Sequence, residues 1–195
     1  NQQTLHGIGL KNPTRIYTAA STSAKEIKHY DQGSILKYET FTSDWYECVV
    51  YVNGKKRTGY IHKSDVENSI TNQKTLHGIG TKNPTRIYSK ASTSSKELKH
   101  YSIGSVLKYQ TFATDWYECV VYVNGRKKTG YIHKNDVENG VTNQQTLHGI
   151  GLQSKTKVYS QASTSSKTLK SYALGTVLKY KKFTTNWYEC TVFIN

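Results

Sequence analysis

The local fold of this chain is encoded most clearly in WYECVVYVNGKKRTGYIH, residues 45–62. Two runs rich in Val, Tyr, Ile and Thr flank the dipeptide Asn53-Gly54. Such residues favour strands, and Asn-Gly supplies the two positive φ angles that a two-residue type I′ hairpin turn requires. The stretch therefore predicts a β-hairpin with strands at 45–52 and 55–62.

The turn also fixes how the two strands pair. With Val52 opposite Lys55, four further pairs follow, namely Tyr46 with Ile61, Cys48 with Gly59, Glu47 with Tyr60, and Trp45 with His62. Side chains alternate between the two faces of a strand. We therefore expect the first two of these pairs to face the core and the last two to share the outer face, with Gly59 leaving room for Cys48.

Shorter strand patterns precede the hairpin. Residues 15–17, 25–30 and 35–39 are rich in strand formers, and a small Ser/Thr-rich loop at 18–23 separates the first two segments. Residues 67–73 are mostly polar and indicate a short linker. No window shows a helical period. The pattern is typical of a compact, all-β module.

The whole pattern recurs along the chain. The motif TLHGIG begins at Thr4, Thr75 and Thr146, a spacing of 71 residues. A fixed period of this length indicates a tandem array. It predicts small SH3-like β-barrel modules at 1–71, 72–142 and 143–195. The same periodicity also allows a permuted frame with a partial module at 1–53 and whole modules at 54–124 and 125–195.

The third copy is incomplete. It stops at the equivalent of Asn53 and lacks the closing strand of its hairpin. An unpaired strand edge is a template for another strand. We expect this copy to be partly disordered, or to exchange strands and be completed by another chain or by residues early in this one. The sequence has no Met, no signal-peptide pattern and no apolar run long enough to be transmembrane, so we expect a piece of a longer protein.

The residues capable of chemistry do not form a catalytic pattern. Cys48, Cys119 and Cys190 occupy the same position in successive copies, so no copy has a partner for an internal disulfide. We expect these cysteines in the core. Cys48 and His62 project to opposite faces in the register above, which excludes a Cys–His nucleophile. Phosphate-loop, paired-carboxylate and metal-ligand spacings are missing from the sequence, which predicts no catalytic residue, metal or cofactor.

The chain is strongly basic, with a formal net charge of +14. Copy one has nine basic and seven acidic residues, copy two has eleven and five, and copy three has seven and one. A positive field raises the local concentration of polyanions, which include teichoic acids, anionic glycans, lipid headgroups and nucleic acids. Charge alone does not choose among them.

Seven short segments of copy one follow one another in an order that is typical of one protein family. They are Ile16-Tyr17, Ser21-Thr22-Ser23, Gly33-Ser34-Ile35-Leu36, Trp45-Tyr46, Asn53-Gly54, Thr58-Gly59-Tyr60-Ile61 and Asp65-Val66-Glu67. Their order resembles the bacterial SH3-like (SH3b) domains, especially the GW modules of Gram-positive autolysins and adhesins. Two positions differ from the family pattern. Where the family has Gly-Trp, this chain has Gly59-Tyr60, and where the family usually has Val, this chain has Cys48. The resemblance implies an anchor that holds a peptidoglycan hydrolase or surface adhesin to the envelope through lipoteichoic acid or peptidoglycan.

Aromatic rings and clustered cations are the candidate ligand-binding groups. Rings can stack on sugars, and Lys and Arg bind phosphates. The SH3-like path would bring three rings of each copy together, and three cations lie at each hairpin tip. The candidates are Tyr17, Trp45, Tyr60, Lys55, Lys56 and Arg57 in copy one, and Tyr88, Trp116, Tyr131, Arg126, Lys127 and Lys128 in copy two. Alternatively, the rings close a small core and the cations are only solvated.

These observations predict a secreted, cell-wall-associated and non-catalytic region that binds a repeating envelope polymer by avidity. An alternative is an adhesin segment that binds a host matrix protein or a sulfated glycan, which the same charge would serve. Nucleic acid ranks low because no reading motif or groove-filling helix is present. An enzyme would need a catalytic constellation, which the sequence lacks.

Overall fold

The computed structural model describes residues 1–194, and Asn195 lies outside the described part. Copy one contains β1 (Thr4–Gly9), β2 (Thr14–Tyr17), β3 (Glu26–Tyr30), β4 (Ile35–Thr40), β5 (Trp45–Val52), β6 (Lys55–His62), the 3₁₀ turn η1 (Lys63–Asp65) and β7 (Val66–Asn68). Copy two contains β8 (Thr75–Gly80), β9 (Thr85–Tyr88), β10 (Glu97–Tyr101), β11 (Val106–Thr111), β12 (Trp116–Val123), β13 (Arg126–His133), η2 (Lys134–Asp136) and β14 (Val137–Asn139). Copy three contains β15 (Thr146–Ile150), β16 (Lys155–Tyr159), β17 (Thr168–Ala173), β18 (Val177–Lys182) and β19 (Tyr188–Glu189). The predicted all-β class is confirmed.

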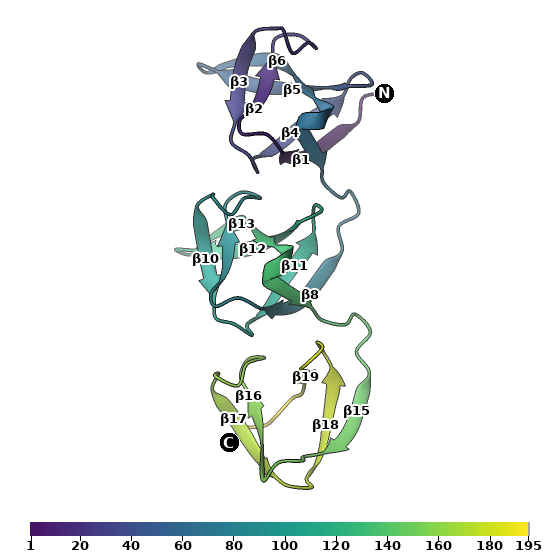
Figure 1. Ribbon diagram of the computed structural model, residues 1–195, viewed down its shortest axis with the longest axis vertical. Coiled ribbons are helices and arrows are strands. Elements are labelled where there is room, and N and C mark those ends of the chain that lie inside the picture. The colour runs from purple at the N-terminus through teal and green to yellow at the C-terminus, as the bar shows by residue number, and fades with distance from the viewer. Residues whose placement is uncertain (195) are drawn as a thin grey trace. The chain divides into compact units, whose positions relative to one another are not determined.

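Each of the first two copies is one seven-stranded antiparallel sheet. The strand order is β3-β2-β6-β5-β4-β1-β7 in copy one, and copy two repeats it as β10-β9-β13-β12-β11-β8-β14. Figure 1 shows the strands of copy one curled around a common interior. The sheets fall within the ranges expected for two modules, while the boundaries at 71 and 142 stay a prediction.

The central hairpin has the predicted geometry. Asn53 and Gly54 have φ angles of 50° and 75°, as a type I′ turn requires. All five predicted pairs are present, from Val52 with Lys55 to Trp45 with His62. Tyr46, Cys48, Gly59 and Ile61 are buried, while Trp45, Glu47, Tyr60 and His62 on the other face are half-buried. The predicted register and both faces are therefore confirmed.

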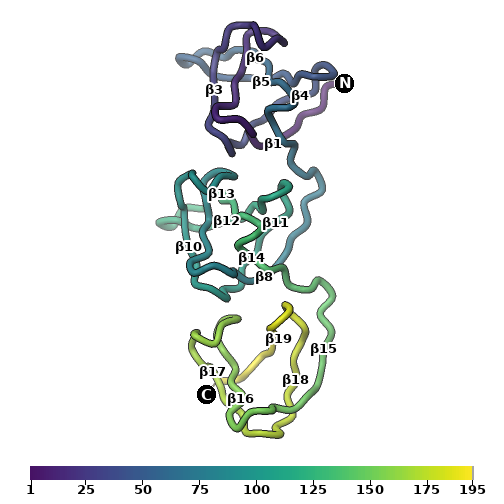
Figure 2. Tube along the Cα trace, viewed as in Figure 1, coloured from purple at the N-terminus to yellow at the C-terminus, as the bar shows by residue number. Residues whose placement is uncertain are grey.

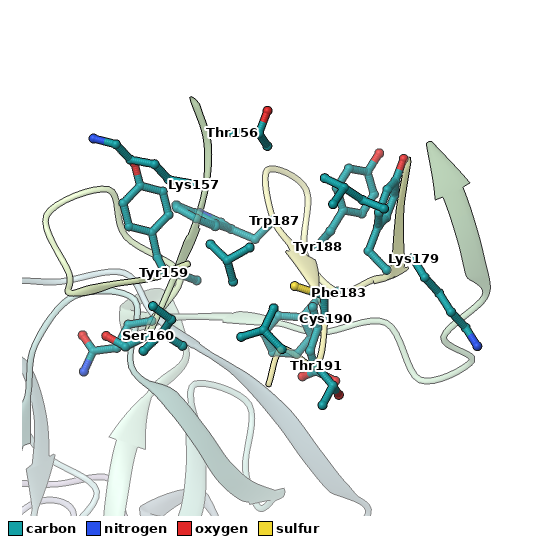
Figure 3. A pocket seen from close by; sticks show the side chains of 18 of the residues that line it. Thr156, Lys157, Tyr159, Ser160, Lys179, Phe183, Trp187, Tyr188, Cys190 and Thr191 are labelled. Atoms are coloured by element: carbon teal, nitrogen blue, oxygen red, sulfur yellow. The ribbon is translucent and has the colours of Figure 1, made fainter. Parts of the chain in front are cut away.

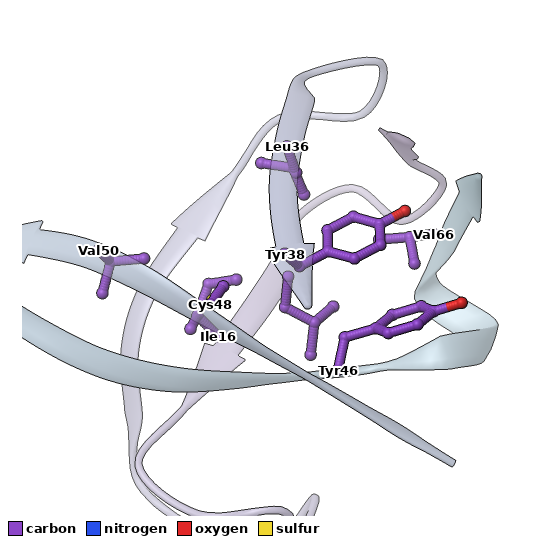
Figure 4. Packing of buried hydrophobic residues seen from close by; sticks show 8 residues of the cluster. Ile16, Leu36, Tyr38, Tyr46, Cys48, Val50 and Val66 are labelled. Atoms are coloured by element: carbon purple, nitrogen blue, oxygen red, sulfur yellow. The ribbon is translucent and has the colours of Figure 1, made fainter. Parts of the chain in front are cut away.

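A single apolar cluster fills copy one. It consists of Ile16, Leu36, Tyr38, Tyr46, Cys48, Val50, Ile61 and Val66. Figure 4 shows the rings of Tyr38 and Tyr46 lying over each other, with centroids 4.5 Å apart. The Tyr38 hydroxyl donates to Asn68 Oδ1 at 2.8 Å, and Asn68 Nδ2 donates to the Tyr46 hydroxyl at 2.9 Å. One amide thus satisfies both phenols at the rim of the core.

Three features differ from the sequence-based expectation. Residues 4–9, for which the sequence pattern predicts no strand, form β1, which pairs with both β4 and β7. Because β7 includes Glu67 and Asn68, the linker between copies one and two is shorter than the expected range 67–73. Gly59 makes room for Ile16 rather than for Cys48, because a Cβ at Gly59 would overlap Ile16 Cγ2.

Copy three forms two separate small sheets, with orders β15-β18-β19 and β16-β17. Figure 2 shows these two groups of strands apart from each other, and among residues 1–194 no strand pairs with both groups. In copy one the strand between the corresponding groups is β6, and copy three has no residues equivalent to it. Cys190 is exposed as a result, so the prediction of a core position is wrong for Cys190 while Cys48 and Cys119 are buried.

The chain divides into two compact units that do not coincide with the copies. The first unit contains residues 1–73, 87–98 and 111–133, so it joins copy one to parts of copy two. The second unit contains 74–86, 99–110 and 134–195, so it joins other parts of copy two to copy three.

Candidate functional site

Copy one presents an aromatic face built on the outer side of its central hairpin. Tyr17 pairs with Tyr60 across β2 and β6, and Trp45 lies opposite His62 across β5 and β6. The Trp45 ring meets Tyr17 edge-on at 6.0 Å and His62 at 5.0 Å between centroids, and Phe41 lies 5.1 Å from Tyr60. The three rings predicted from the sequence are therefore brought together, and Phe41 joins them. We call Tyr17, Phe41, Trp45, Tyr60 and His62 the aromatic face.

Copy two has the same ring geometry. Trp116 lies 6.0 Å from Tyr88 and 5.0 Å from His133, and Phe112 lies 5.3 Å from Tyr131. Each distance is within 0.2 Å of its counterpart in copy one. The local sequence thus builds the same face twice.

The two faces differ in what covers them. In the first compact unit, Ile8 lies in one buried cluster with the copy-two residues Tyr88, Ala91, Phe112, Ala113, Trp116 and Tyr131, and Ile35 packs against it. Phe112 is 3% exposed, whereas its counterpart Phe41 is 46% exposed. The predicted ligand residues Tyr88, Trp116 and Tyr131 therefore lie beneath copy one, while Tyr17, Trp45 and Tyr60 remain accessible.

Burial also changes the chemistry of the covered ring. Burial raises the pKa of the Tyr131 phenol, and the adjacent Glu118 carboxylate raises it further. The Tyr131 hydroxyl donates to Glu118 Oε2 at 3.4 Å. Because the neutral phenol is favoured there, Tyr131 serves as an apolar packing group with one satisfied hydroxyl.

The hairpin tips form a second candidate surface. The predicted cations are all exposed, namely Lys55, Lys56 and Arg57 in copy one and Arg126, Lys127 and Lys128 in copy two. They lie on β6 and β13, immediately after the type I′ turns. No carboxylate lies among these residues, so each tip is a concentrated positive charge.

The sequence-based prediction missed the apolar part of this surface. Val49 and Tyr51 share the outer face of β5, and Tyr51 is 61% exposed opposite Lys56. Val120 and Tyr122 repeat them in copy two, where Tyr122 is also 61% exposed. The alternation along β5 could have revealed these residues. Every second residue of a strand points to the same face, which here brings together Trp45, Glu47, Val49 and Tyr51. We call residues 49, 51 and 55–57 the hairpin arm of copy one, and residues 120, 122 and 126–128 the hairpin arm of copy two.

The copy-one arm has a further cation beside it, close to the turn. Lys28 Nζ donates to the Tyr51 carbonyl oxygen at 2.8 Å and lies 5.4 Å from the centre of the Tyr30 ring. A flat exposed ring beside several cations suits a polymer that carries both sugar or alkyl faces and anionic groups.

The groups with potential for catalysis lie in the core or apart from one another. Burial raises the pKa of the Cys48 and Cys119 thiols to about 12, with a smaller effect from the neighbouring glutamates, so neither is a thiolate near neutral pH. Within residues 1–194, no group of three or more His, Cys, Asp or Glu is placed to hold a metal ion. No helix in the described part of the chain is long and apolar enough to cross a membrane.

Copy three contains a cavity of about 620 Å³ between its two sheets. Its walls include Val158, Leu178, Tyr180, Phe183 and Cys190. Figure 3 shows Tyr159 and Trp187 beside each other and Cys190 close to Phe183. In copy one the corresponding interior holds Ile61 of β6, which is 1% exposed. The cavity therefore has the apolar lining of a core that one strand would complete.

Comparison with known proteins gives only distant likenesses. No protein-family model matches the chain, and no curated protein matches it. Among solved structures, NlpC1 and NlpC2 from Trichomonas vaginalis are 14% and 13% identical, with a TM-score of 0.28 each over 70% and 71% of this chain. The native structure of CBDP35 is 18% identical with a TM-score of 0.26, over 71% of this chain and 97% of that one. The chain spans 46% and 49% of the two Trichomonas structures. At these TM-scores the likenesses establish neither a shared fold nor a shared function.

Proposed function

We propose that this chain is a non-catalytic region that binds a repeating anionic polymer of the Gram-positive envelope, lipoteichoic acid or peptidoglycan, by avidity. The observation that carries the proposal is the pair of equivalent hairpin arms, each with an exposed tyrosine and three exposed cations. A single such arm binds weakly, because exposed cations are strongly solvated. Two arms on one chain gain affinity when the ligand also repeats.

The polymer class follows from the groups on the arms. Lys and Arg bind phosphate groups through charge-assisted hydrogen bonds, which favours a teichoic acid. Tyr51 and Tyr122 offer flat faces to a sugar ring or a polyol chain, and both lie beside the cations across the hairpin. The region would act outside the cell, at the wall, as the targeting part of a peptidoglycan hydrolase or a surface adhesin.

Sedimentation with purified cell walls tests the proposal. The variant changes Lys55, Lys56, Arg57, Arg126, Lys127 and Lys128 to Gln, and the control changes Lys11, Lys25, Lys37, Lys82, Lys96 and Lys108 to Gln. Both sets are exposed and remove the same charge. We expect the arm variant to lose at least about tenfold in affinity, which is 1.4 kcal/mol, and the control to lose much less. Equal losses would show that net charge, rather than the arms, drives binding.

Removal of teichoic acid from the walls separates the two polymers. Binding that disappears identifies teichoic acid, and binding that persists identifies peptidoglycan. The alternative of an adhesin segment for a host matrix protein or a sulfated glycan rests on the same positive charge. Retention on heparin without any binding to walls would favour that alternative and overturn the envelope proposal.

The cavity of copy three supports a further proposal about partners, which is strand exchange. A strand equivalent to β13 would fill the apolar space and pair with β16 and β19. A synthetic peptide with the sequence of residues 126–138 should raise the melting temperature of the chain. A peptide in which the residues equivalent to Gly130 and Ile132 are changed to Lys should not.

A further inference from the structure

The two hairpin arms lie within the same compact unit of the chain. The first unit contains residues 1–73 and 111–133, so it holds the arm of copy one and the arm of copy two. It also holds the contacts through which these two copies pack against each other. We call these contacts the junction. They decide how the two arms are held relative to each other.

The apolar centre of the junction joins two strand ends of copy one to aromatic side chains of copy two. Ile8 of β1 is buried in one cluster with Phe112 and Trp116, and Ile35 of β4 packs against this cluster. Neither isoleucine belongs to the core cluster of copy one. Their burial therefore stabilises the contact between the copies rather than the fold of copy one.

Hydrogen bonds to the backbone fix the orientation of this contact. The Ala91 N–H donates to the Gly33 carbonyl oxygen at 3.0 Å, and the Thr114 N–H donates to Glu67 Oε1 at 2.7 Å. Gly33 has φ +82°, and a Cβ at this position would lie 2.5 Å from the Ala91 carbonyl oxygen, so only glycine permits the approach. Because hydrogen bonds are directional, each of them restricts the rotation of one copy against the other.

The linker between the two copies is itself tied to both of them. The Ser69 N–H donates to the His6 carbonyl oxygen of copy one, and the Ile70 N–H donates to the Phe112 carbonyl oxygen of copy two, both at 2.8 Å. Only residues 71–74 then remain before β8 begins. So short a segment does not behave as a flexible tether.

The strands that carry the arms begin at the junction. In copy two, Trp116 and Tyr131 lie in the buried cluster and also on β12 and β13, which stay paired up to the turn that bears the arm. In copy one, Ile35 lies on β4, and β4 pairs with β5, which carries Tyr51. Backbone hydrogen bonds join the two strands of a hairpin, so the orientation of its base sets the orientation of its tip. The junction therefore orients both arms.

The second compact unit contains the same contacts. The Ala162 N–H donates to the Gly104 carbonyl oxygen at 3.0 Å, and the Thr185 N–H donates to Glu138 Oε1 at 2.8 Å. Each contact is displaced by 71 residues from its counterpart in the first unit. The junction is therefore a property of the repeat rather than of one pair of copies.

We infer that the junction makes the two hairpin arms one bidentate site, which binds a polymer tightly only when a single polymer chain reaches both arms. The inference rests on the proposed function of the arms and adds the length and regularity of the ligand to it. Once one arm is bound, the other is already oriented, so binding does not have to order a flexible tether. The preferred ligand is therefore a long, regularly repeating polyanion rather than a short fragment of one.

Two variants of the 195-residue chain open the junction without changing its net charge. One carries Ala91→Gln and Ala113→Gln, which lie in loops on the copy-two side of the buried cluster. The other carries Ile8→Asn and Ile35→Asn on the copy-one side, outside the core of copy one. Hydrogen exchange of the backbone amide of residue 91 measures whether the junction has opened, because this amide donates to Gly33.

Binding to soluble lipoteichoic acid freed of its acyl chains measures the effect. We expect each junction variant to bind at least about tenfold more weakly than the wild type. In a chain that keeps only one arm, through Arg126→Gln, Lys127→Gln and Lys128→Gln, the same junction changes should have no effect. The matched control carries Ala20→Gln and Thr42→Gln, at the equivalent exposed positions of copy one, and should bind like the wild type.

A junction variant whose residue-91 amide exchanges freely but which keeps the wild-type affinity would overturn the inference. So would an equal loss in the one-arm chain, because the junction would then act on a single arm. Unchanged exchange in both variants would show that the named contacts do not hold the copies together, which also contradicts the inference. If walls without teichoic acid retain the chain, soluble peptidoglycan strands replace lipoteichoic acid as the probe. A wild-type chain that binds neither polymer would instead contradict the proposed function itself.

Discussion

Trp45 and Trp116 occupy equivalent positions in successive copies and meet their histidines at the same 5.0 Å and 88°, yet they differ in accessibility. Trp116 is 9% exposed because Ile8 packs in the same cluster, whereas Trp45 is half-buried. One local sequence thus builds a packing surface in one copy and an accessible surface in the other.

The first prediction concerns the accessibility of these two tryptophans. Acrylamide quenches an indole only where it can reach the ring, so Trp45 should account for more of the quenching than Trp116. We expect Trp45→Phe to lower the mean quenching constant and Trp116→Phe to raise it, at low protein concentration. Identical shifts for the two variants would contradict the burial difference.

The second prediction concerns Ile8. Its side chain is 3% exposed within the junction cluster, so Ile8→Ala should destabilise the first compact unit by about 2–5 kcal/mol through lost burial and a residual cavity. The equivalent Ile150 is exposed, and Ile150→Ala should change stability by less than about 0.5 kcal/mol. Urea unfolding of both variants in dilute solution measures the difference.

The third prediction separates two roles of glycine in the central hairpin. Gly54 has φ +75° with open space around it, so Gly54→Ala should cost about 1 kcal/mol of backbone strain. Gly59 faces Ile16 Cγ2 and the Tyr17 carbonyl oxygen inside the core, so Gly59→Ala should cost about 1–3 kcal/mol or more by overpacking. Thermal unfolding should therefore rank Gly59→Ala as the more damaging change.

The fourth prediction concerns the reactivity of the cysteines. Cys190 is exposed, and although partial burial raises the pKa of its thiol too, the deeper burial of Cys48 and Cys119 raises their pKa to about 12. Iodoacetamide at pH 8.5 should label Cys190 within minutes and the other two only after denaturation, because the thiolate is the nucleophile. Peptide mass spectrometry reads the three sites separately. Rapid labelling of Cys48 in the folded chain would show that the copy-one core is open.

The raised thiol pKa values also predict the pH dependence of stability. Between the ordinary value of 9.0 and about 12, the folded state holds protons that the unfolded chain releases. The unfolding free energy should therefore be fully supported below pH 9 and fall as the pH rises through this interval. Cys48→Ala should make this decline shallower, and urea titrations at pH 8 and pH 10 measure the slope.

The aromatic face could be predicted in part from the sequence. The type I′ turn fixed the register of β5 and β6, and the strand alternation placed Trp45 and Tyr60 on the outer side. The same alternation places Val49 and Tyr51 on the outer side, so the apolar part of the arms could also have been predicted from the sequence. Phe41 was not, because it lies in the loop between β4 and β5, where no local period applies.

The repeat, the all-β class, the hairpin with its pairing and the charged tips could all be predicted from the amino-acid sequence, since each depends on residues close together in the chain. Long-range packing, in contrast, places β1 between β4 and β7, and it places Ile8 against Trp116 while Trp45 stays half-buried. The burial of a side chain depends on which residues, distant in the sequence, pack against it. Two copies with nearly the same sequence therefore fold alike and still expose different side chains.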